Sequence, residues 1–357
     1  MRIAIITFQS ALNYGAVLQT YALSAFLRQQ GHEPKVIQYC PNAELTGKFK
    51  NRYRVFGLHP ADYLNAYRQH AFKAFRERYI PQTERVYHTL DDLAELEAFD
   101  AYICGSDQVW NAELTGGQLD PAYFLSFAKA GAKRIAYAAS TGGNGFQDEV
   151  RAAQLLENLT YLSVREASLV EPVARLSGKM VKPVLDPTLL PADYSPLIQK
   201  RRGRYILLYA SQEVPGIYRR ARDLAQMTGL PILNLGARVN PWKHPGRQIC
   251  SSPAGYVSLF SQAEYVVTSS FHGTVFSTIF KRPFFSCALE GERAARNVRM
   301  VDFLENVGLR DRFFEADRVL KNDDLRAAQA VDWTAVSEKL HSLQQASVEF
   351  LQSSLSE

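Results

Sequence analysis

The sequence is poor in cysteine, has no long hydrophobic run and lacks the common catalytic motifs, and each absence excludes a class of protein. The 4 cysteines among its 357 residues are far apart and form no C-x-x-C pair, so neither a disulfide framework nor a zinc site is expected. The longest uncharged run in the apolar part of the chain, Tyr265 to Phe280, contains Ser, Thr, Gly and His and is too short to span a bilayer. No G-x-S-x-G, Walker A or H-E-x-x-H pattern occurs, so we expect no bound metal.

The sequence also has no large excess of charge of one sign. The formal net charge is +5, and 46% of the residues are hydrophobic and 22% charged, as in globular proteins. No basic run has the spacing of a nucleic-acid-binding motif, so nucleic acid is not an expected partner. The mild positive charge suits a small anionic substrate or an acceptor at a membrane surface. The apolar N-terminal run stops at Thr7, too early for the core of a signal peptide, so we expect a cytoplasmic protein.

Short apolar runs alternate with amphipathic runs along most of the chain, which predicts parallel sheets covered by helices on both faces. Because one core rarely grows beyond roughly 250–300 residues, the length indicates two domains. A proline-rich and then basic stretch between residues 187 and 203 interrupts the pattern. We therefore predict an N-terminal Rossmann-like domain at residues 1–190, a C-terminal one at 201–330 and a terminal helix at 331–357, with a cleft between the two sheets.

An amphipathic, basic helix is predicted at residues 62–79. Its basic face either meets water or contacts an anionic surface or a lipid-linked acceptor. The second alternative would place the protein at the inner face of the membrane.

The first candidate site is the segment T-S-S-F-H-G-T at residues 268–274, which joins a predicted strand to a predicted helix. Ligands of doubly wound sheets bind at such strand ends, where helix N-termini attract anions. The hydroxyls of Ser270 and Thr274 would bind an oxyanion or cap the helix, and Gly273 would let the backbone approach a ligand. His272 could move protons near neutral pH. The alternative is an N-cap beside a histidine that satisfies a buried carbonyl group.

The second candidate is Arg165, at the end of a predicted strand in the other domain. A guanidinium group suits phosphate or carboxylate because it binds either with two parallel hydrogen bonds. The alternative is an exposed ion pair between Arg165 and its neighbour Glu166, which would contribute little to stability. Asp186 follows another strand and either orients Arg165 or only ends that strand. We take Glu166 and Asp186 as supporting residues.

Two further turns could hold a sugar acceptor. Asn13, Tyr14 and Gly15 join the first strand to the first helix without G-x-G-x-x-G spacing, so a tightly bound NAD is not expected. They would bind a sugar or an anion, or Asn13 would only cap the helix. In the second turn Asp107 would accept hydrogen bonds from sugar hydroxyls, and Trp110 would pack against the sugar ring. The alternative there is an Asx turn beside a buried tryptophan.

Taken together, these segments resemble the polysaccharide pyruvyl transferase family over roughly residues 1–310. Each segment is short, and the resemblance depends on their order and spacing. The segments are I-T at 6–7 with N-Y-G-A-V-L-Q at 13–19, G-S-D-Q-V-W-N at 105–111, S-V-R-E at 163–166, D-P-T at 186–188, S-F-H-G-T at 270–274 and N-V-R at 297–299.

The resemblance implies two Rossmann-like domains arranged as in GT-B glycosyltransferases, and transfer of a pyruvyl group from phosphoenolpyruvate onto two hydroxyls of a sugar as a cyclic ketal. It assigns the role of donor-binding arginine to Arg165 and that of site histidine to His272. Some relatives carry an arginine where this chain has Ser270, so we expect Arg299 to supply the second donor cation. No cofactor besides the donor is implied. The acceptor would be a sugar or a lipid-linked oligosaccharide in the biosynthesis of a bacterial capsule or exopolysaccharide.

Two other functions fit the same architecture. One is a glycosyltransferase that uses a nucleotide sugar bound in the C-terminal domain. The other is a non-catalytic glycan-binding protein of the same pathway. The sequence specifies neither the acceptor sugar and its hydroxyls nor the oligomeric state.

Overall fold

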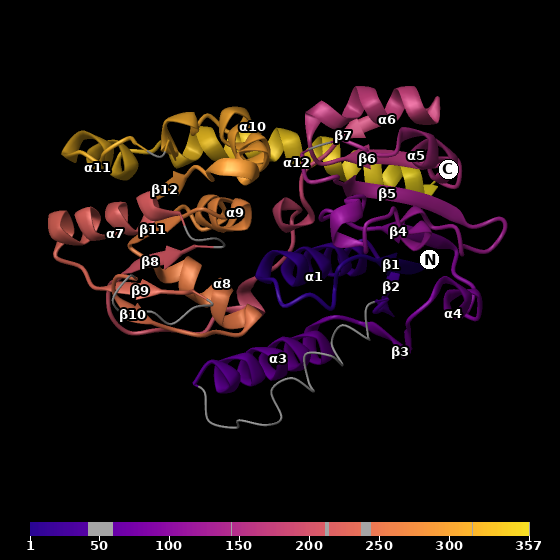
Figure 1. The fold of residues 1–357 in the computed structure, drawn as a ribbon, viewed down its shortest axis with the longest axis horizontal. Coiled ribbons are helices and arrows are strands. Elements are labelled where there is room, and N and C mark those ends of the chain that lie inside the picture. The colour runs from indigo at the N-terminus through magenta and orange to yellow at the C-terminus, as the bar shows by residue number, and fades with distance from the viewer. Residues whose placement is uncertain (42–59, 144, 211–213, 237–243, 316, 357) are drawn as a thin grey trace. The chain divides into compact units, whose positions relative to one another are not determined.

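The computed structural model describes residues 1–41, 60–143, 145–210, 214–236, 244–315 and 317–356, which form two compact units (Figure 1). Unit 1 comprises Met1–Asp62, Phe72–Asp193 and Leu343–Glu357, and unit 2 comprises Tyr63–Ala71 and Tyr194–Ser342. The main division, at Asp193, lies inside the interval left between the two predicted domains. The predicted C-terminal helix is α12 (Trp333–Ser356), whose last part, from Leu343 on, belongs to unit 1.

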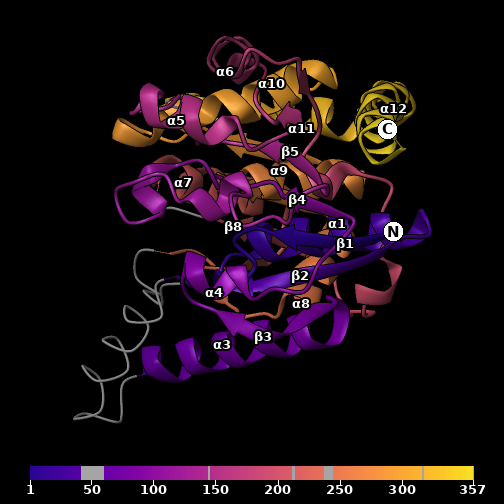
Figure 2. The same cartoon turned by 90° about the vertical axis from the view of Figure 1, so that its right-hand side faces the viewer.

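Unit 1 contains a seven-stranded parallel sheet with the order β3-β2-β1-β4-β5-β6-β7. Figure 2 shows the strands from β5 through β4, β1 and β2 to β3 in this order. The order reverses between β1 and β4, so this unit has the switch point of a doubly wound sheet there. The strands are β1 (Arg2–Ile6), β2 (Glu33–Tyr39), β3 (Gln82–Tyr87), β4 (Ala101–Cys104), β5 (Lys133–Ala139), β6 (Tyr161–Val164) and β7 (Val181–Pro183).

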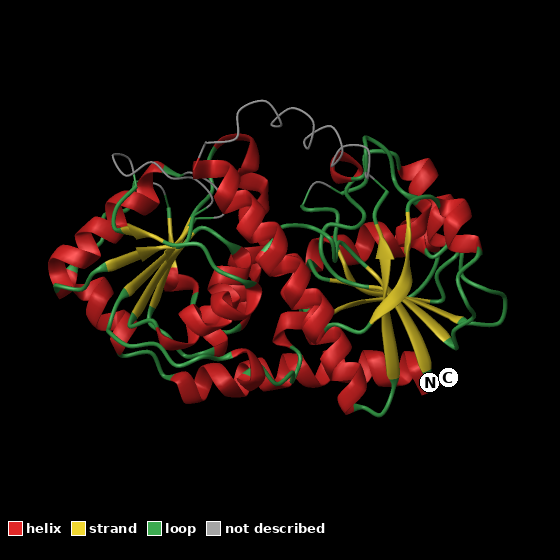
Figure 3. Ribbon diagram, turned by 90° about the horizontal axis from the view of Figure 1, so that it is seen from below, coloured by secondary structure: helices red, strands yellow, loops and turns green. Residues whose placement is uncertain are grey.

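Helices cover both faces of the unit 1 sheet, as Figure 3 shows. Central strands are buried on both sides, which explains their continuous apolar sequences. The last part of the C-terminal helix also belongs here: the backbone N–H of Leu185 donates to the Ser347 hydroxyl at 3.0 Å, and the Lys133 ammonium group donates to the Leu355 carbonyl at 2.7 Å. The helices are α1 (Tyr14–Gln29), α3 (Pro60–Tyr79), α4 (Leu90–Ala94), α5 (Glu149–Leu156), α6 (Val170–Ser177) and α12 (Trp333–Ser356), of which α3 and α12 are divided between the units.

Unit 2 repeats the same topology with six parallel strands in the order β10-β9-β8-β11-β12-β13. Its switch point lies between β8 and β11, the two central strands. The strands are β8 (Ile206–Tyr209), β9 (Ile232–Asn234), β10 (Arg247–Gln248), β11 (Tyr265–Thr268), β12 (Phe284–Cys287) and β13 (Phe313–Phe314), and the further helices are α7 (Pro215–Thr228), α8 (Pro253–Gln262), α9 (Phe271–Ile279), α10 (Val298–Asn306) and α11 (Asn322–Gln329).

Each unit has its own hydrophobic core. The core of unit 1 contains Cys104 and that of unit 2 contains Cys287, whereas Cys40 and Cys250 are half-buried. All four thiols are free. Among the described residues, no helix is long and apolar enough to cross a membrane, and no three His, Cys, Asp or Glu side chains are placed to hold a metal ion.

Candidate functional site

The turn between β11 and α9 lies at the switch point of unit 2. The Thr268 hydroxyl at the end of β11 donates to the Tyr209 carbonyl of β8 at 2.8 Å and accepts from the Ser270 backbone N–H at 3.1 Å. Ser270 is the N-cap of α9, and its hydroxyl accepts from the backbone N–H of Gly273 at 3.4 Å. The positive end of α9 is therefore fixed beyond the carboxyl ends of the two central strands, where an anionic ligand is favoured.

His272 and Arg299 are brought together at this helix start by Phe271. The His272 ring meets the Phe271 ring edge-on, with 5.2 Å between the centroids, and His272 is 9% exposed. The Arg299 guanidinium carbon lies 5.5 Å from the centre of the same Phe271 ring, a cation–π distance. Arg299 is in the first turn of α10, which Phe303 also joins to Phe271 through a ring contact at 6.2 Å. An imidazole and a guanidinium group thus share one aromatic support beside the N-terminus of α9.

Two residues outside the predicted site, Tyr209 and Asn297, support this arrangement. The hydroxyl of Tyr209 is hydrogen-bonded to the Ser270 side chain; burial raises the pKa of Tyr209 to about 12, although the positive charge of Arg68 partly offsets that effect. Tyr209 is therefore a neutral phenol at ordinary pH. The side-chain amide of Asn297 binds the backbone N–H and C=O of Leu289 at 2.8 and 2.9 Å, which fixes the segment before Arg299. The resemblance pointed to Asn297, but no pattern pointed to Tyr209.

The predicted role of Thr274 needs correction, and Gly273 has a structural role of its own. A Cβ atom at Gly273 would lie 2.2 Å from the Thr268 hydroxyl, so a close contact inside the protein requires glycine here, and the approach of its backbone to a ligand stays a prediction. Thr274 is fully buried, and its hydroxyl lies 2.6 Å from that of Ser286 on β12. It joins α9 to the sheet and cannot contact the donor as we expected.

Arg165 follows β6 in unit 1 and is held in a buried network of ion pairs. Its Nε donates to Glu166 Oε1 at 3.1 Å and one terminal nitrogen donates to Asp186 Oδ2 at 3.0 Å. The three side chains are 3%, 2% and 0% exposed, so the alternative of a surface pair is wrong. Burial alone would lower the pKa of Arg165, but the carboxylates of Glu166, Asp186 and Asp107 outweigh it and raise this pKa.

Hydroxyl groups complete the network around both carboxylates. Ser106 donates to Asp186 Oδ2 at 3.2 Å, Thr188 donates to Asp186 Oδ1 at 2.7 Å, and Ser140 donates to Glu166 Oε1 at 2.9 Å. The network therefore joins the carboxyl ends of β4, β5, β6 and β7. Asp186 does orient Arg165, as one of the two expectations held. Direct binding of a donor by Arg165 stays a prediction, since the guanidinium is already balanced by two carboxylates.

The turns proposed for acceptor binding are used differently. Asn13 is the N-cap of α1, and its side-chain oxygen accepts from the Gly15 backbone N–H at 2.8 Å. The backbone N–H of Gly15 therefore already has its hydrogen-bond partner within the helix cap. Tyr14 is buried and its ring packs on Phe72 at 5.0 Å. The cap alternative is correct for Asn13, whose side chain is nevertheless exposed, and Tyr14 belongs to the core.

The turn after β4 gives a mixed result. Trp110 is 1% exposed, stacks on Phe124 at 5.3 Å and donates from its indole nitrogen to the Tyr123 carbonyl. It cannot pack against a sugar in the way we expected, because its ring is enclosed by the core. Asp107 is half-buried and has a left-handed backbone with φ of 86°. Such a conformation is strained for a non-glycine residue and is typical of functional sites, so Asp107 remains a candidate for acceptor binding.

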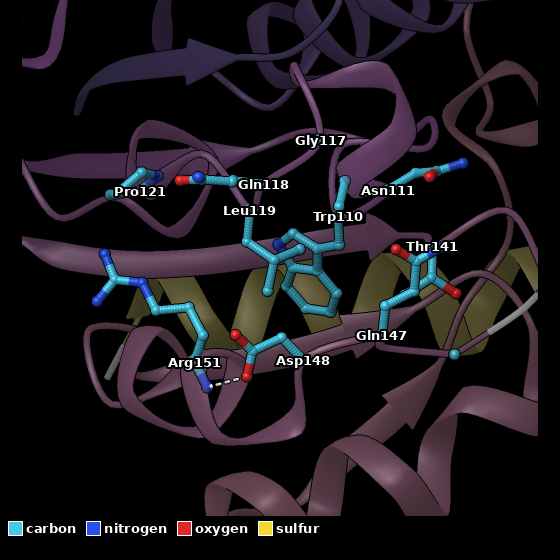
Figure 4. A pocket seen from close by; sticks show the side chains of 12 residues that line it. Trp110, Asn111, Gly117, Gln118, Leu119, Pro121, Thr141, Gln147, Asp148 and Arg151 are labelled. Carbon is cyan, nitrogen blue, oxygen red and sulfur yellow. Dashed lines mark hydrogen bonds between the residues drawn. The ribbon is translucent and has the colours of Figure 1, made fainter.

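A pocket of about 480 Å³ opens beside this turn in unit 1 (Figure 4). Its walls come from the segments that follow β4 and β5 and from the start of α5. The lining residues are Trp110, Asn111, Ala112, Gly117, Gln118, Leu119, Pro121, Thr141, Gly145, Gln147, Asp148 and Arg151. None of the predicted site residues except Trp110 lies in it.

Comparison with known proteins decides the family. Residues 13–291 match the model of the family described as polysaccharide pyruvyl transferase. The chain belongs to this family. The resemblance noted from the short segments is thereby confirmed over most of the sequence.

Solved structures show the fold. A UDP-N-acetylglucosamine 2-epimerase from Rickettsia bellii is similar with a TM-score of 0.52 at 12% identity, over 98% of this chain and 95% of that one. A putative UDP-N-acetylglucosamine 2-epimerase from Listeria monocytogenes gives 0.50 at 11% identity, over 98% and 94%. These similarities confirm a fold of the GT-B type with two parallel-sheet α/β domains. No curated protein matches the chain.

Proposed function

We propose that this member of the family transfers the pyruvyl group of phosphoenolpyruvate onto two hydroxyls of a sugar, forming a cyclic ketal in bacterial polysaccharide biosynthesis. The observation that carries the proposal is the pairing of His272 with Arg299 on Phe271 at the N-terminus of α9. Phosphoenolpyruvate is small and bears several negative charges. A helix N-terminus and a guanidinium group suit such an anion without any nucleotide-binding surface.

The reaction needs a group that can both donate and accept protons, and a group that stabilises the negative charge of the departing phosphate. In the first step a sugar hydroxyl adds to C2 of the donor, loses its proton, and C3 gains a proton. Phosphate then leaves with the C2–O electron pair, and the second hydroxyl closes on C2 and gives up its proton. His272 is the group at this site that could transfer these protons, a contribution of about 10²–10⁴ in rate. Arg299 and the α9 N-terminus would stabilise the charge of the departing phosphate.

Two further arginines and the acceptor complete the proposed reaction. Arg68, on the part of α3 that belongs to unit 2, carries a charge that acts on the Tyr209 hydroxyl. It is a further candidate cation for the donor, at a site where this chain has Ser270 and not arginine. We also propose that Arg165 acts on the same donor, and that the acceptor is a sugar or lipid-linked oligosaccharide used at the cytoplasmic face of the membrane.

The experiment combines product analysis with one pair of variants. The protein is incubated with phosphoenolpyruvate and a panel of glycan acceptors, and mass spectrometry detects the ketal while a coupled assay detects phosphate. We expect His272→Asn to lower the rate by about 10²–10⁴ with an unchanged melting temperature. His70→Asn, an exposed histidine of α3, is the matched control and should retain full activity. Full activity in His272→Asn would reject the assigned role.

Binding measurements separate this function from that of a nucleotide-sugar glycosyltransferase, which the GT-B fold favours as the second candidate. We expect phosphoenolpyruvate to raise the melting temperature of the protein, and UDP and GDP to leave it unchanged, because ligands stabilise the state that binds them. Stabilisation by a nucleotide and not by phosphoenolpyruvate would favour the glycosyltransferase.

A further inference from the structure

The pocket in unit 1 has the chemistry of a site for an uncharged sugar. Its volume of about 480 Å³ lies within the ~300–1,000 Å³ range of small-molecule sites. The two ionic side chains in its lining, Asp148 and Arg151, have opposite charges and cancel. Asp148 is already engaged, because it accepts from the backbone N–H of Arg151 at 2.9 Å as the N-cap of α5. A ligand with several negative charges would therefore find no compensating charge here.

Neutral hydrogen-bonding groups make up most of the polar lining. Asn111, Gln118 and Gln147 contribute amides, which can both donate to and accept from hydroxyl groups. Leu119 and Pro121 contribute apolar surface. Amide donors and acceptors beside apolar surface match the hydroxyl and C–H groups of a sugar ring.

A buried hydroxyl in the pocket wall points to a missing partner. Thr141 is 3% exposed, and its Oγ1 forms no hydrogen bond within the described part of the protein. Buried polar atoms nearly always have a partner, because leaving one unpaired costs ~1–3 kcal/mol. Since Thr141 lines the pocket, a hydroxyl of a bound molecule could supply this hydrogen bond.

The turn that carries Thr141 is closely packed and connected to the ion-pair network. Gly142 has φ of 86°, and a Cβ atom there would lie 2.4 Å from the side-chain oxygen of Gln108. Ser140, which precedes Thr141, donates to Glu166, the partner of Arg165. The turn is thus fixed on both sides of Thr141, so a ligand would bind a preformed surface.

We propose that this pocket binds one uncharged sugar unit of the acceptor. This inference rests on the proposed function only in taking the bound sugar to be part of the acceptor. Binding of the sugar itself does not depend on pyruvyl transfer. Recognition of the acceptor is thereby assigned to Thr141 and Gln147 in place of the Trp110 ring.

The test is saturation-transfer NMR on the full protein without phosphoenolpyruvate, with lactose, cellobiose, N,N′-diacetylchitobiose and mannobiose as probes. Wild-type protein should transfer saturation to at least one disaccharide. Gln147→Trp, at an exposed position on the pocket wall, should abolish transfer, whereas Gln154→Trp, exposed on α5 and outside the pocket lining, should not. Absence of transfer to every probe, or equal transfer by Gln147→Trp, would overturn the proposal.

Thr141→Val gives a second measurement in which loss of folding cannot imitate loss of binding. The change removes a buried, unpaired hydroxyl and keeps the shape, so the melting temperature should stay the same or rise. Affinity for the disaccharide should fall roughly two- to tenfold, the value of one hydrogen bond. Unchanged affinity would show that the ligand does not use Thr141. Sugar binding without any pyruvyl transfer would refute the proposed reaction and leave the pocket assignment intact. Pyruvyl transfer that neither Gln147→Trp nor Thr141→Val affects would refute the pocket assignment and leave the proposed reaction intact.

Discussion

Replacing Arg165 with methionine tests whether this residue supports the fold or only a ligand. Methionine keeps most of the aliphatic volume and removes the charge. In the wild-type protein the guanidinium lies 3.1 and 3.0 Å from the carboxylates of Glu166 and Asp186. The variant leaves both carboxylates in a buried position without their cation.

The expected loss follows from the burial of the three side chains. An exposed ion pair contributes about 0–1 kcal/mol, whereas removal of one partner from a buried pair costs about 3–5 kcal/mol because a charge stays buried alone. In a domain of roughly 150–250 residues each kcal/mol lowers the melting temperature by about 2–4 °C. We therefore expect unit 1 of Arg165→Met to melt about 6–20 °C below the wild-type protein.

Differential scanning calorimetry of three variants provides the assay and its controls. Arg175→Met removes an arginine whose pair with Glu149, at 2.7 Å, is half-exposed, and should lose no more than about 1 kcal/mol. Adding Glu166→Gln and Asp186→Asn to Arg165→Met removes the two buried charges and should recover part of the loss. If the free energy of unfolding of Arg165→Met were within about 1 kcal/mol of the wild-type value and pyruvyl transfer were lost, a role of Arg165 in supporting the fold would be refuted. Arg165 would then be a ligand-binding residue.

Two further predictions concern unit 2. Burial raises the pKa of Tyr209 from 10.0 to about 12, so the folded protein keeps the phenol proton at a pH where the unfolded chain loses it. The stability that this proton contributes is complete below pH 10 and is lost as the pH rises to 12, so the free energy of unfolding should fall by about 3 kcal/mol over this range. Urea titrations of Tyr209→Phe should show a smaller fall. An equal fall in the variant would exclude Tyr209 as the cause. Gly273→Ala should cost about 1–3 kcal/mol, since its Cβ would lie 2.2 Å from the Thr268 hydroxyl; Thr268→Ala in the same chain should recover part of this cost, and simple additivity of the two changes would contradict the close contact.

Much of the fold could be predicted from the sequence because central strands of a parallel sheet are continuous apolar runs. The strand predicted to lead into the segment at residues 268–274 is β11, Tyr265–Thr268. The strands β3, β10 and β13, which lie at edges of the two sheets, are hard to recognise from the sequence. In β3 only Thr83 and Tyr87 are buried, while β10 and β13 have two residues each. Such short or polar edge strands carry no clear period of hydrophobicity.

The positions of the candidate residues in the fold were predictable, and their packing was less so. The turns with Ser270 and Arg165 were selected by the rule that ligands bind beyond strand ends, which depends only on topology; the structure places both turns directly after strands, β11 and β6. The rule cannot tell which side chain in a turn faces the interior. Trp110 was expected at the surface and is enclosed by the core, and Thr274, one helical turn after Ser270, faces β12. Both roles depend on tertiary packing, which short segments do not encode.

The division of α12 affects how the polypeptide can mature on the ribosome. Unit 2 is, in the order of synthesis, largely an insertion into unit 1, since Leu343–Glu357 returns to the first unit. Until Leu343–Glu357 emerges from the ribosome, Leu185 and Lys133 lack their contacts with Ser347 and Leu355. Unit 2 can therefore be completed before unit 1 although its sequence begins later, which reverses the usual N-terminal-first order. A nascent chain that stops before residue 343 would expose the surface of unit 1 that this helix covers.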